Sequence, residues 1–298
     1  MTADGRALRV ALAMAPGIGP VTLRRLWSRF GAGFESALKS RPEQVAARLR
    51  LSRRATSGLV AALEPAALAE AAELIRRTED HGGRAVLLGE PDFPQRLSAI
   101  RDAPVALFLI GRTEVLGLTP AIAVVGARRA ADASRRLAGR LAGAAAAAGA
   151  AVISGMAAGI DSEAHRAALE QGGATAAVLA GGPERPFPPD LAELHQRLCA
   201  EGVVLSEQPA GIRTESHQLV RRNRWIAALA DTLVVIEASA HSGSLHAAAA
   251  ALEYGRGLLV ADFEGDPERY AGNARLLAEG ARRLDPAADP AGLLEPMR

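Results

Sequence analysis

The spacing of apolar residues divides the chain into two parts. Before residue 82, apolar positions recur at helical spacing, and Leu23, Leu26, Trp27 and Phe30 share one face of a predicted helix. From residue 121, short runs that are apolar at every position alternate with helical stretches. Such runs predict strands that are covered on both faces. We therefore expect a small all-α domain followed by a doubly wound, Rossmann-like, mostly parallel α/β sheet.

Element boundaries follow from these runs and from glycine and proline punctuation. In the first part, further helices are expected at 42–50 and 65–81, and short strands follow at 85–88 and 105–110. The expected strands of the second part cover 121–126, 151–154, 174–180, 203–206, 232–237 and 257–262. Its expected helices cover 130–148, 161–171, 189–200, 222–230, 243–255 and 273–281. The predicted domains are a helical domain (1–82), a linker or extension packing on the sheet (83–118), a Rossmann-like domain (119–285) and a tail too short for a winged helix (286–298).

A glycine-bracketed turn, Gly17-Ile18-Gly19, precedes the amphipathic helix of the first part. A turn of this kind is the hairpin of helix–hairpin–helix or SAM-like domains, and its outward amides can hold a backbone phosphate. Such hairpins usually work in pairs, and the sequence contains one. A tight turn within a small helical bundle is therefore an equally open interpretation.

Nearly all of the positive charge of the chain is carried by arginine side chains. The formal net charge is only +2, but Lys39 is the only lysine, so nearly all positive groups are guanidinium. Arginine binds phosphate with a two-pronged fork and stacks on bases, which favours a phosphate-rich partner. A coding bias towards GC-rich codons explains the same replacement of lysine by arginine, and both explanations stay open.

Other features exclude several classes of protein. The single cysteine, Cys199, allows neither a disulfide framework nor a thiolate metal site within one chain, and the histidine spacing predicts no metal site. The apolar stretch 8–15 ends at Pro16-Gly17, too early for a signal peptide, and no apolar run is long enough to span a membrane. We expect a cytoplasmic protein that has no membrane segment and needs no cofactor.

The predicted strand ends carry glycine, serine and arginine. The first buried strand leads into Gly126-Ala127-Arg128-Arg129, and the next ends in Ser154-Gly155. Neither the glycine pattern nor the ribose-binding acid of a dinucleotide site is present, and no P-loop sequence occurs. Because ligands of parallel sheets bind at the carboxyl ends of the strands, we expect an anion to bind there.

Several polar groups near these ends have two possible roles. Asp161 and His165 lie four residues apart on one predicted helix. They can form an acid–base pair, or Asp161 can cap the helix N-terminus while His165 lies on the helix face. Glu207 and Glu237 close two strands, where they can transfer protons or brace nearby arginines. The basic cluster RRNRW (221–225) is expected at a helix start, either in contact with phosphate or bracing a loop.

Seven segments in order resemble the DprA/Smf family of bacterial DNA-processing proteins. They are VVGARR (124–129), SGMAAGIDSEAH (154–165), AVLAGGPERPFP (177–188), LSEQPAG (205–211), RRNRWIAALADTLVVIEA (221–238), SGSLHAAAAALEYGR (242–256) and NARLLAEGA (273–281). The segment 90–111 resembles the linker signature of the family. The resemblance implies a protein that is not an enzyme, binds single-stranded DNA without sequence preference, loads the recombinase RecA onto it, helps to displace single-strand-binding protein, and forms a homodimer through the Rossmann-like domain. The DNA processing of natural transformation, recombination and repair would be its context.

The resemblance also assigns the DNA site. The family's DNA pocket lies at a Gly-Ser-Arg turn, which carries over to Gly126 and Arg128, with Ala127 in place of the serine. With the other strand-end residues, the predicted DNA contacts are Gly126, Arg128, Arg129, Ser154, Gly155, Gly159, Phe187, Arg221, Arg222, Asn223, Arg224, Ser242, Gly243 and Ser244.

The chain departs from the family pattern at several positions. No lysine follows Phe187-Pro188, where the family commonly has one that contacts phosphate. Leu219-Val220 replaces a Phe-Pro, and His246 replaces a threonine. Two other interpretations therefore stay open. One is a Rossmann-like phosphoribohydrolase acting on nucleoside monophosphates, although SGSL is a poor match to the phosphate turn of those enzymes. The other is a scaffold that contacts RecA without binding DNA.

Overall fold

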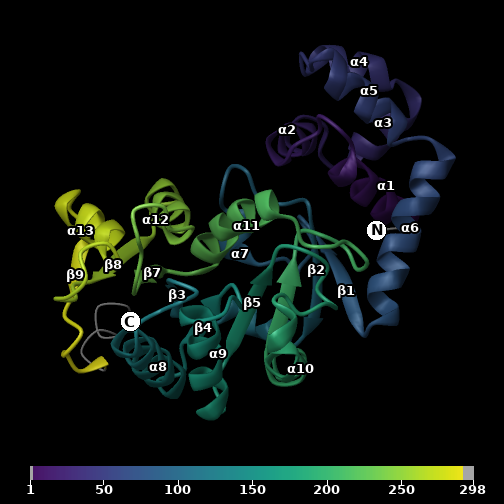
Figure 1. Ribbon diagram of the computed structural model, residues 1–298. Coiled ribbons are helices and arrows are strands. Elements are labelled where there is room, and N and C mark those ends of the chain that lie inside the picture. The colour runs from purple at the N-terminus through teal and green to yellow at the C-terminus, as the bar shows by residue number, and fades with distance from the viewer. Residues whose placement is uncertain (1–2, 291–298) are drawn as a thin grey trace.

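The computed structural model describes residues 3–290 and has two lobes (Figure 1). The smaller lobe is entirely helical and confirms the all-α prediction for the first part of the chain. Its helices are α1 (Ala3–Met14), α2 (Pro20–Phe30), α3 (Phe34–Ser40), α4 (Pro42–Arg48), α5 (Arg53–Ala61) and α6 (Pro65–Asp80), with a 3₁₀ turn at Gly31–Gly33. Proline opens α2, α4 and α6, where its fixed φ suits the first helical position and its missing N–H costs nothing.

The larger lobe contains one sheet of nine strands in the order β1-β2-β6-β5-β4-β3-β7-β8-β9. The strands are β1 (Gly83–Leu87), β2 (Ala106–Gly111), β3 (Ala121–Val125), β4 (Ala151–Ser154), β5 (Thr175–Leu179), β6 (Val203–Ser206), β7 (Thr232–Val235), β8 (Gly257–Ala261) and β9 (Arg282–Leu284). Strands β3 to β9 pair in parallel, while β2 pairs antiparallel with both β1 and β6. The mostly parallel, Rossmann-like sheet that the apolar runs predicted is confirmed.

Helices cover both faces of this sheet (Figure 1). One face packs against α7 (Gln95–Ser98), α11 (Ser216–Leu229), α12 (Ser244–Glu253) and α13 (Ala271–Ala278). The other packs against α8 (Asp132–Ala147), α9 (Ile160–Glu170) and α10 (Ala192–Glu201). Short 3₁₀ turns lie at Thr113–Gly117 and Pro189–Leu191. Within β3, Ala123 faces the first group and Ile122 and Val124 face the second, so every residue of the strand is buried.

Three parts of the fold differ from the sequence prediction. The segment 83–118 contributes β1 and β2 to the sheet itself, beyond packing on it. The short strand β9 was not predicted, because Arg282 and Arg283 are exposed and lack an apolar pattern. Helix α11 begins at Ser216, six residues before the predicted start, because Glu215 and Gln218 form a capping box there. Residues 291–298 of the predicted tail lie outside the described residues.

No helix within residues 3–290 is both long and apolar enough to cross a lipid bilayer.

Candidate nucleic-acid interface

A cavity of about 390 Å³ opens at the carboxyl end of β3. The chain runs from β3 through β4 and β5 to β6 on one side, and then returns to β7 on the other side of β3. This reversal of strand order leaves a crevice at the strand ends, which is where open α/β sheets bind ligands. The cavity is lined by Val125, Gly126, Ala127, Arg128, Ala157, Asp161, Ser216, Leu219, Val220, Arg222, Asn223, Ile226, Ser242, Gly243, Ser244 and Ala247.

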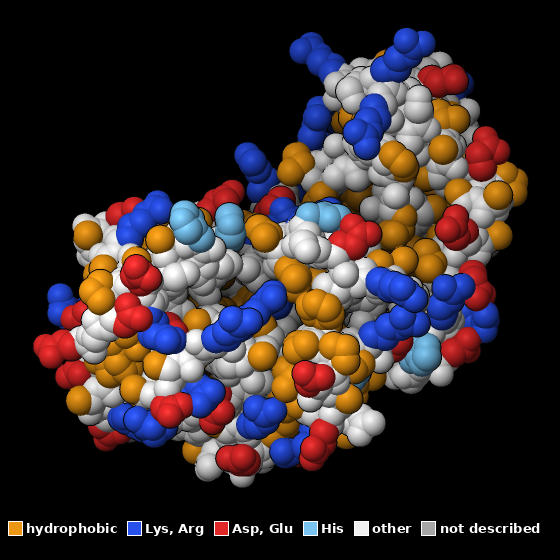
Figure 2. All heavy atoms as spheres, viewed as in Figure 1, with side chains coloured by type: hydrophobic (Ala, Val, Ile, Leu, Met, Phe, Trp, Pro, Cys, Tyr) orange, Lys and Arg blue, Asp and Glu red, His pale blue; other side chains and the backbone are white. Residues whose placement is uncertain are grey.

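Arg128 lies at the rim of this cavity with an exposed side chain. Among the residues that the structure describes, none accepts a hydrogen bond or forms an ion pair with its guanidinium. The basic and acidic side chains of the face seen in Figure 2 are interspersed, without one continuous basic patch. The formal net charge of the chain is only +2, so a preference of this cavity for an anion would have to come from Arg128 and its neighbours.

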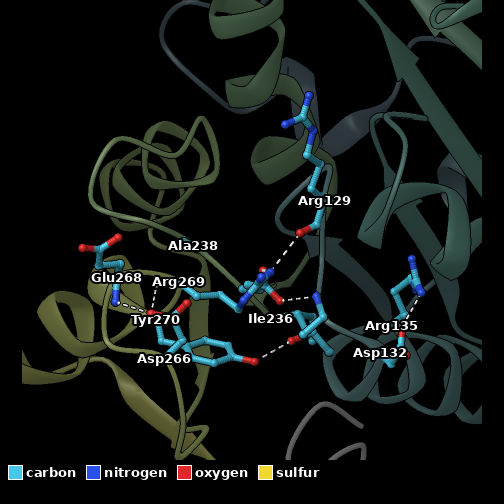
Figure 3. Close-up of polar contacts among 12 residues, drawn as sticks. Arg129, Asp132, Arg135, Ile236, Ala238, Asp266, Glu268, Arg269 and Tyr270 are labelled. Carbon is cyan, nitrogen blue, oxygen red and sulfur yellow. Dashed lines mark hydrogen bonds and ion pairs between the residues drawn. The ribbon is translucent and has the colours of Figure 1, made fainter.

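Arg129 does not line the cavity. Its side chain is exposed and extends away from the polar network beside it (Figure 3). Its backbone carbonyl accepts a hydrogen bond of 2.9 Å from Arg269. The structure thus separates the two neighbouring arginines, and the predicted DNA contact of Arg129 stays a prediction.

The cavity is supported by three residues that do not line it but contact residues beside it or lining it: Ser154, Gly155 and Gly159. The Ser154 hydroxyl is fully buried and donates to the carbonyl of Val124 at 2.6 Å. A Cβ on Gly155 would lie 1.4 Å from Nη1 of Arg222, so this glycine makes room for the guanidinium. Gly159 has a φ of +84°, and a Cβ there would lie 2.3 Å from the Ala127 carbonyl oxygen. Both Ser154 and Gly155 are buried, which does not support their predicted direct contacts with DNA, and these contacts stay predictions.

The basic cluster of α11 lies within the helix and not at its start, contrary to the prediction. Consecutive helical residues point about 100° apart, so the four polar side chains take different directions. Arg222 is buried beneath the cavity and donates to the Val178 carbonyl at 3.0 Å, and Asn223 donates to the Gly243 carbonyl at 2.9 Å. These two residues line the cavity.

The other two arginines of the cluster brace neighbouring segments. Arg221 pairs with Glu207 at 2.9 Å and lines a different cavity, which Gly17 and Gly19 of the helical lobe also border. Arg224 pairs with Asp102 at 2.6 Å and stacks on Trp225. Both arginines are therefore occupied by carboxylates, which does not support their predicted contact with DNA.

Helix α12 closes the cavity with its N-terminus. Ser242, Gly243 and Ser244 line the cavity, and the Ser242 side chain accepts a hydrogen bond from the Ser244 amide at 3.3 Å. The N-terminus of a helix carries partial positive charge. The amides of Ser244, Leu245 and His246 already donate to Ser242 and Gly243, so this turn offers its charge and not free donors. With Arg128 opposite, this turn suits a phosphate group.

Phe187 lies outside the cavity. It follows β5, forms a cis peptide bond with Pro188, and remains 37% exposed. Its proposed role in stacking a base stays a prediction for a second part of the surface.

Asp161 and His165 do not form an acid–base pair. Asp161 accepts a hydrogen bond from the Ala157 amide at 3.3 Å, and burial raises its pKa although Arg222 opposes that shift. Burial in turn lowers the pKa of the Arg222 guanidinium. Nδ1 of His165 lies 2.7 Å from the Thr175 hydroxyl. The pair thus belongs to the buried support of the site.

The two strand-end glutamates, Glu207 and Glu237, each hold a nearby arginine, which is one of the two roles that the sequence left open. Glu207 accepts from Arg221 and lies 3.4 Å from the Trp225 indole nitrogen. Glu237 is 1% exposed and accepts from the Ala131 amide and from Arg269. Neither glutamate lines the cavity at β3. No group of three or more metal-ligating side chains occurs in residues 3–290.

Sequence reasoning missed several parts of this site. The apolar wall of Leu219, Val220 and Ile226 was not recognised, and Arg269 was not considered at all. The capping pair Glu215 and Gln218 was the available signal for the wall, because it sets where α11 begins and hence which residues face the cavity. No local pattern marks Arg269.

His165 provides a test of this buried support. Burial lowers the pKa of His165 to about 3, below an unfolded-state value near 6.5. The unfolded chain therefore binds the extra proton between these values, and the free energy of unfolding should fall by up to about 1.4 kcal/mol per unit as pH drops through this window. Urea unfolding from pH 7 to pH 4 measures it, and His165→Gln should show a shallower decline. An NMR titration of the imidazole with a midpoint near 6.5 would contradict the prediction.

The geometry first defines a class of protein. An open, doubly wound sheet with an arginine, a helix N-terminus and close glycine turns at its switch point defines a Rossmann-like protein whose crevice has the chemistry to accept an anion. The family model of DNA recombination-mediator protein A matches residues 84–294. The chain therefore belongs to the DNA recombination-mediator protein A family, which confirms the resemblance to DprA/Smf.

Known proteins of similar sequence carry the same names. The chain is 30% identical over 287 residues to Protein Smf of Synechocystis, covering 94% of this chain and 70% of that protein. It is 35% identical over 229 residues to the putative DNA processing protein DprA of Mycobacterium tuberculosis, covering 73% of this chain and 58% of that protein.

Solved structures agree with the sequence comparison. The crystal structure of DprA from Streptococcus pneumoniae superimposes with a TM-score of 0.68 at 26% identity, covering 93% of this chain and 98% of that one. A DprA structure from Helicobacter pylori, described by its single-stranded DNA binding mode, gives a TM-score of 0.64 at 25% identity and covers 72% of this chain and 97% of that one. The match to the S. pneumoniae structure covers 93% of this chain and therefore includes residues outside the Rossmann-like region.

Proposed function

We propose that this chain binds single-stranded DNA without reading its sequence and passes it to RecA, as a cytoplasmic homodimer and without enzymatic activity. The observation that carries the proposal is Arg128, an exposed arginine that no side chain or carbonyl of residues 3–290 pairs with, at the rim of a cavity closed by the α12 N-terminus. The H. pylori relative, whose structure is described by its binding of single-stranded DNA, supports this choice of ligand. Displacement of single-strand-binding protein and a role in transformation, recombination or repair belong to the same proposal.

The first test is fluorescence anisotropy with labelled oligo-dT, oligo-dC and a matched duplex over a salt series. Single strands of different sequence should bind alike and more tightly than the duplex. The logarithm of the affinity should fall with the logarithm of salt concentration by about 0.7 per phosphate neutralised. A flat salt dependence, or no binding at low salt, would contradict the proposal.

Two further assays separate the alternatives. Incubation with nucleoside monophosphates should release no free base, whereas a phosphoribohydrolase would release it. RecA filament formation on DNA coated with single-strand-binding protein should accelerate when the chain is added. A chain that binds RecA but not DNA would be the scaffold.

A further inference from the structure

A segment outside the cavity holds the loop that carries Arg128. This segment, 266–273, follows β8 and packs beside the loops after β3 and β7 (Figure 3). Nη1 of Arg269 donates to the Arg129 carbonyl at 2.9 Å and to the Glu237 carboxylate at 2.8 Å. The other Glu237 oxygen accepts from the Ala131 amide at 2.9 Å. Arg269 and Glu237 together therefore fix the backbone on the C-terminal side of Arg128.

The same segment also fixes the second loop of the cavity. The Asn273 side chain accepts from the Ala238 amide at 2.7 Å and donates to the Ile236 carbonyl at 3.0 Å. The amide of Gly272 donates to the Ala238 carbonyl at 2.8 Å. This second loop leads into Ser242 and the N-terminus of α12. One segment thus holds both sides of the anion-binding cavity.

The burial of Glu237 makes the loss of these contacts energetically costly. Glu237 is 1% exposed, and its charge is compensated by one guanidinium and one backbone amide. A buried carboxylate without such partners is costly, so the loop is held where Glu237 can be satisfied. Tyr270 anchors the segment further, because its hydroxyl lies 3.0 Å from that of Ser134 on α8.

We infer that Arg269 and Glu237 are positioning residues for the DNA site, which set the place of Arg128 without touching DNA. This inference rests on the proposed function. A loop held in its binding conformation loses less conformational entropy when the ligand binds, so loosening it should weaken affinity without removing a phosphate contact.

The test uses two substitutions that change the net charge of the protein in opposite directions. Arg269→Gln removes a positive charge, and Glu237→Gln removes a negative charge, yet both should weaken binding of oligo-dT by about tenfold. Electrostatics alone predicts tighter binding for Glu237→Gln. The salt slope should equal that of the unmodified protein in both variants, because the number of phosphates neutralised does not change.

A matched pair of controls lies on the neighbouring helix. Asp132 and Arg135 form an exposed ion pair at the start of α8 (Figure 3). Asp132→Asn and Arg135→Gln make the same charge changes close to the same loop, and both should stay within twofold of the unmodified protein. Equal effects in the two pairs would overturn the inference.

Hydrogen exchange of the free protein gives a readout that does not depend on DNA. The amides of 127–131 should exchange faster in Arg269→Gln than in Arg135→Gln. Weaker binding with unchanged exchange and a slope reduced by about 0.7 would make Arg269 a direct phosphate contact and overturn its positioning role. If one variant does not fold, the other decides by the same criteria. Failure of the unmodified protein to bind oligo-dT would instead refute the proposed function.

Discussion

Replacing Arg128 by alanine is expected to lower the affinity for single-stranded DNA about 10- to 100-fold, since a hydrogen bond between charged groups contributes about 1.5–3 kcal/mol. Arg128 is exposed at the cavity rim and has no protein partner in the described residues, so its loss removes a ligand contact without leaving a protein group unpaired. The salt slope should fall by about 0.7, and all sequences should be affected alike. Anisotropy titrations with oligo-dT and oligo-dC over a salt series measure both quantities.

Arg136→Ala is the matched control for this prediction. Arg136 is an exposed arginine of α8 that does not line the cavity, so the variant makes the same change in net charge. Its affinity should stay within about twofold of the unmodified protein. Equal losses in the two variants would show that only net charge matters, and unchanged affinity in Arg128→Ala would exclude Arg128 from the site.

Replacing the buried Arg222 by methionine is expected to lower the free energy of unfolding by about 1–3 kcal/mol at pH 8, because it leaves the Val178 carbonyl without its donor and removes the favourable charge interaction with the buried Asp161 carboxylate. Such a loss is a large part of the stability of an ordinary domain. The side chain of Arg222 also supports the cavity floor and donates to the Val178 carbonyl. Urea unfolding at pH 5 and pH 8 measures the effect.

The destabilisation should be smaller at pH 5 than at pH 8. Burial already raises the pKa of Asp161, and Arg222 opposes that shift, so its removal raises the pKa further. A carboxyl whose pKa is higher in the folded state loses stability as pH rises above its unfolded value near 3.9. The double variant Arg222→Met/Asp161→Asn should recover part of the loss at pH 8. A loss that is the same at both pH values would contradict this account.

Much of the fold could be predicted because its signals are local. The apolar run AIAVV (121–125) forms β3 with every residue buried, and the run 151–154 forms β4 with the predicted bounds. Continuous burial on both faces makes such strands apolar throughout, which is visible in the sequence. The cluster 221–225 shows the opposite case. The sequence prediction began α11 six residues too late and therefore grouped its arginines at the start of the helix. In the structure, the helix directs Arg221, Arg222 and Arg224 to three different partners.

The sequence by itself determined most of the helices and strands from β1 to β8, the family, and the place of Arg128 and Ser242–Ser244 near strand ends, because periodicity and turn residues act over a few positions. Only the tertiary structure decided which of these groups are free to bind. Within residues 3–290 no group bonds to the Arg128 guanidinium. Arg222 is buried against Gly155, and Arg269 reaches the Arg129 carbonyl across 140 positions of the chain. Contacts between distant segments depend on how the sheet and its helices pack, and no local pattern records them.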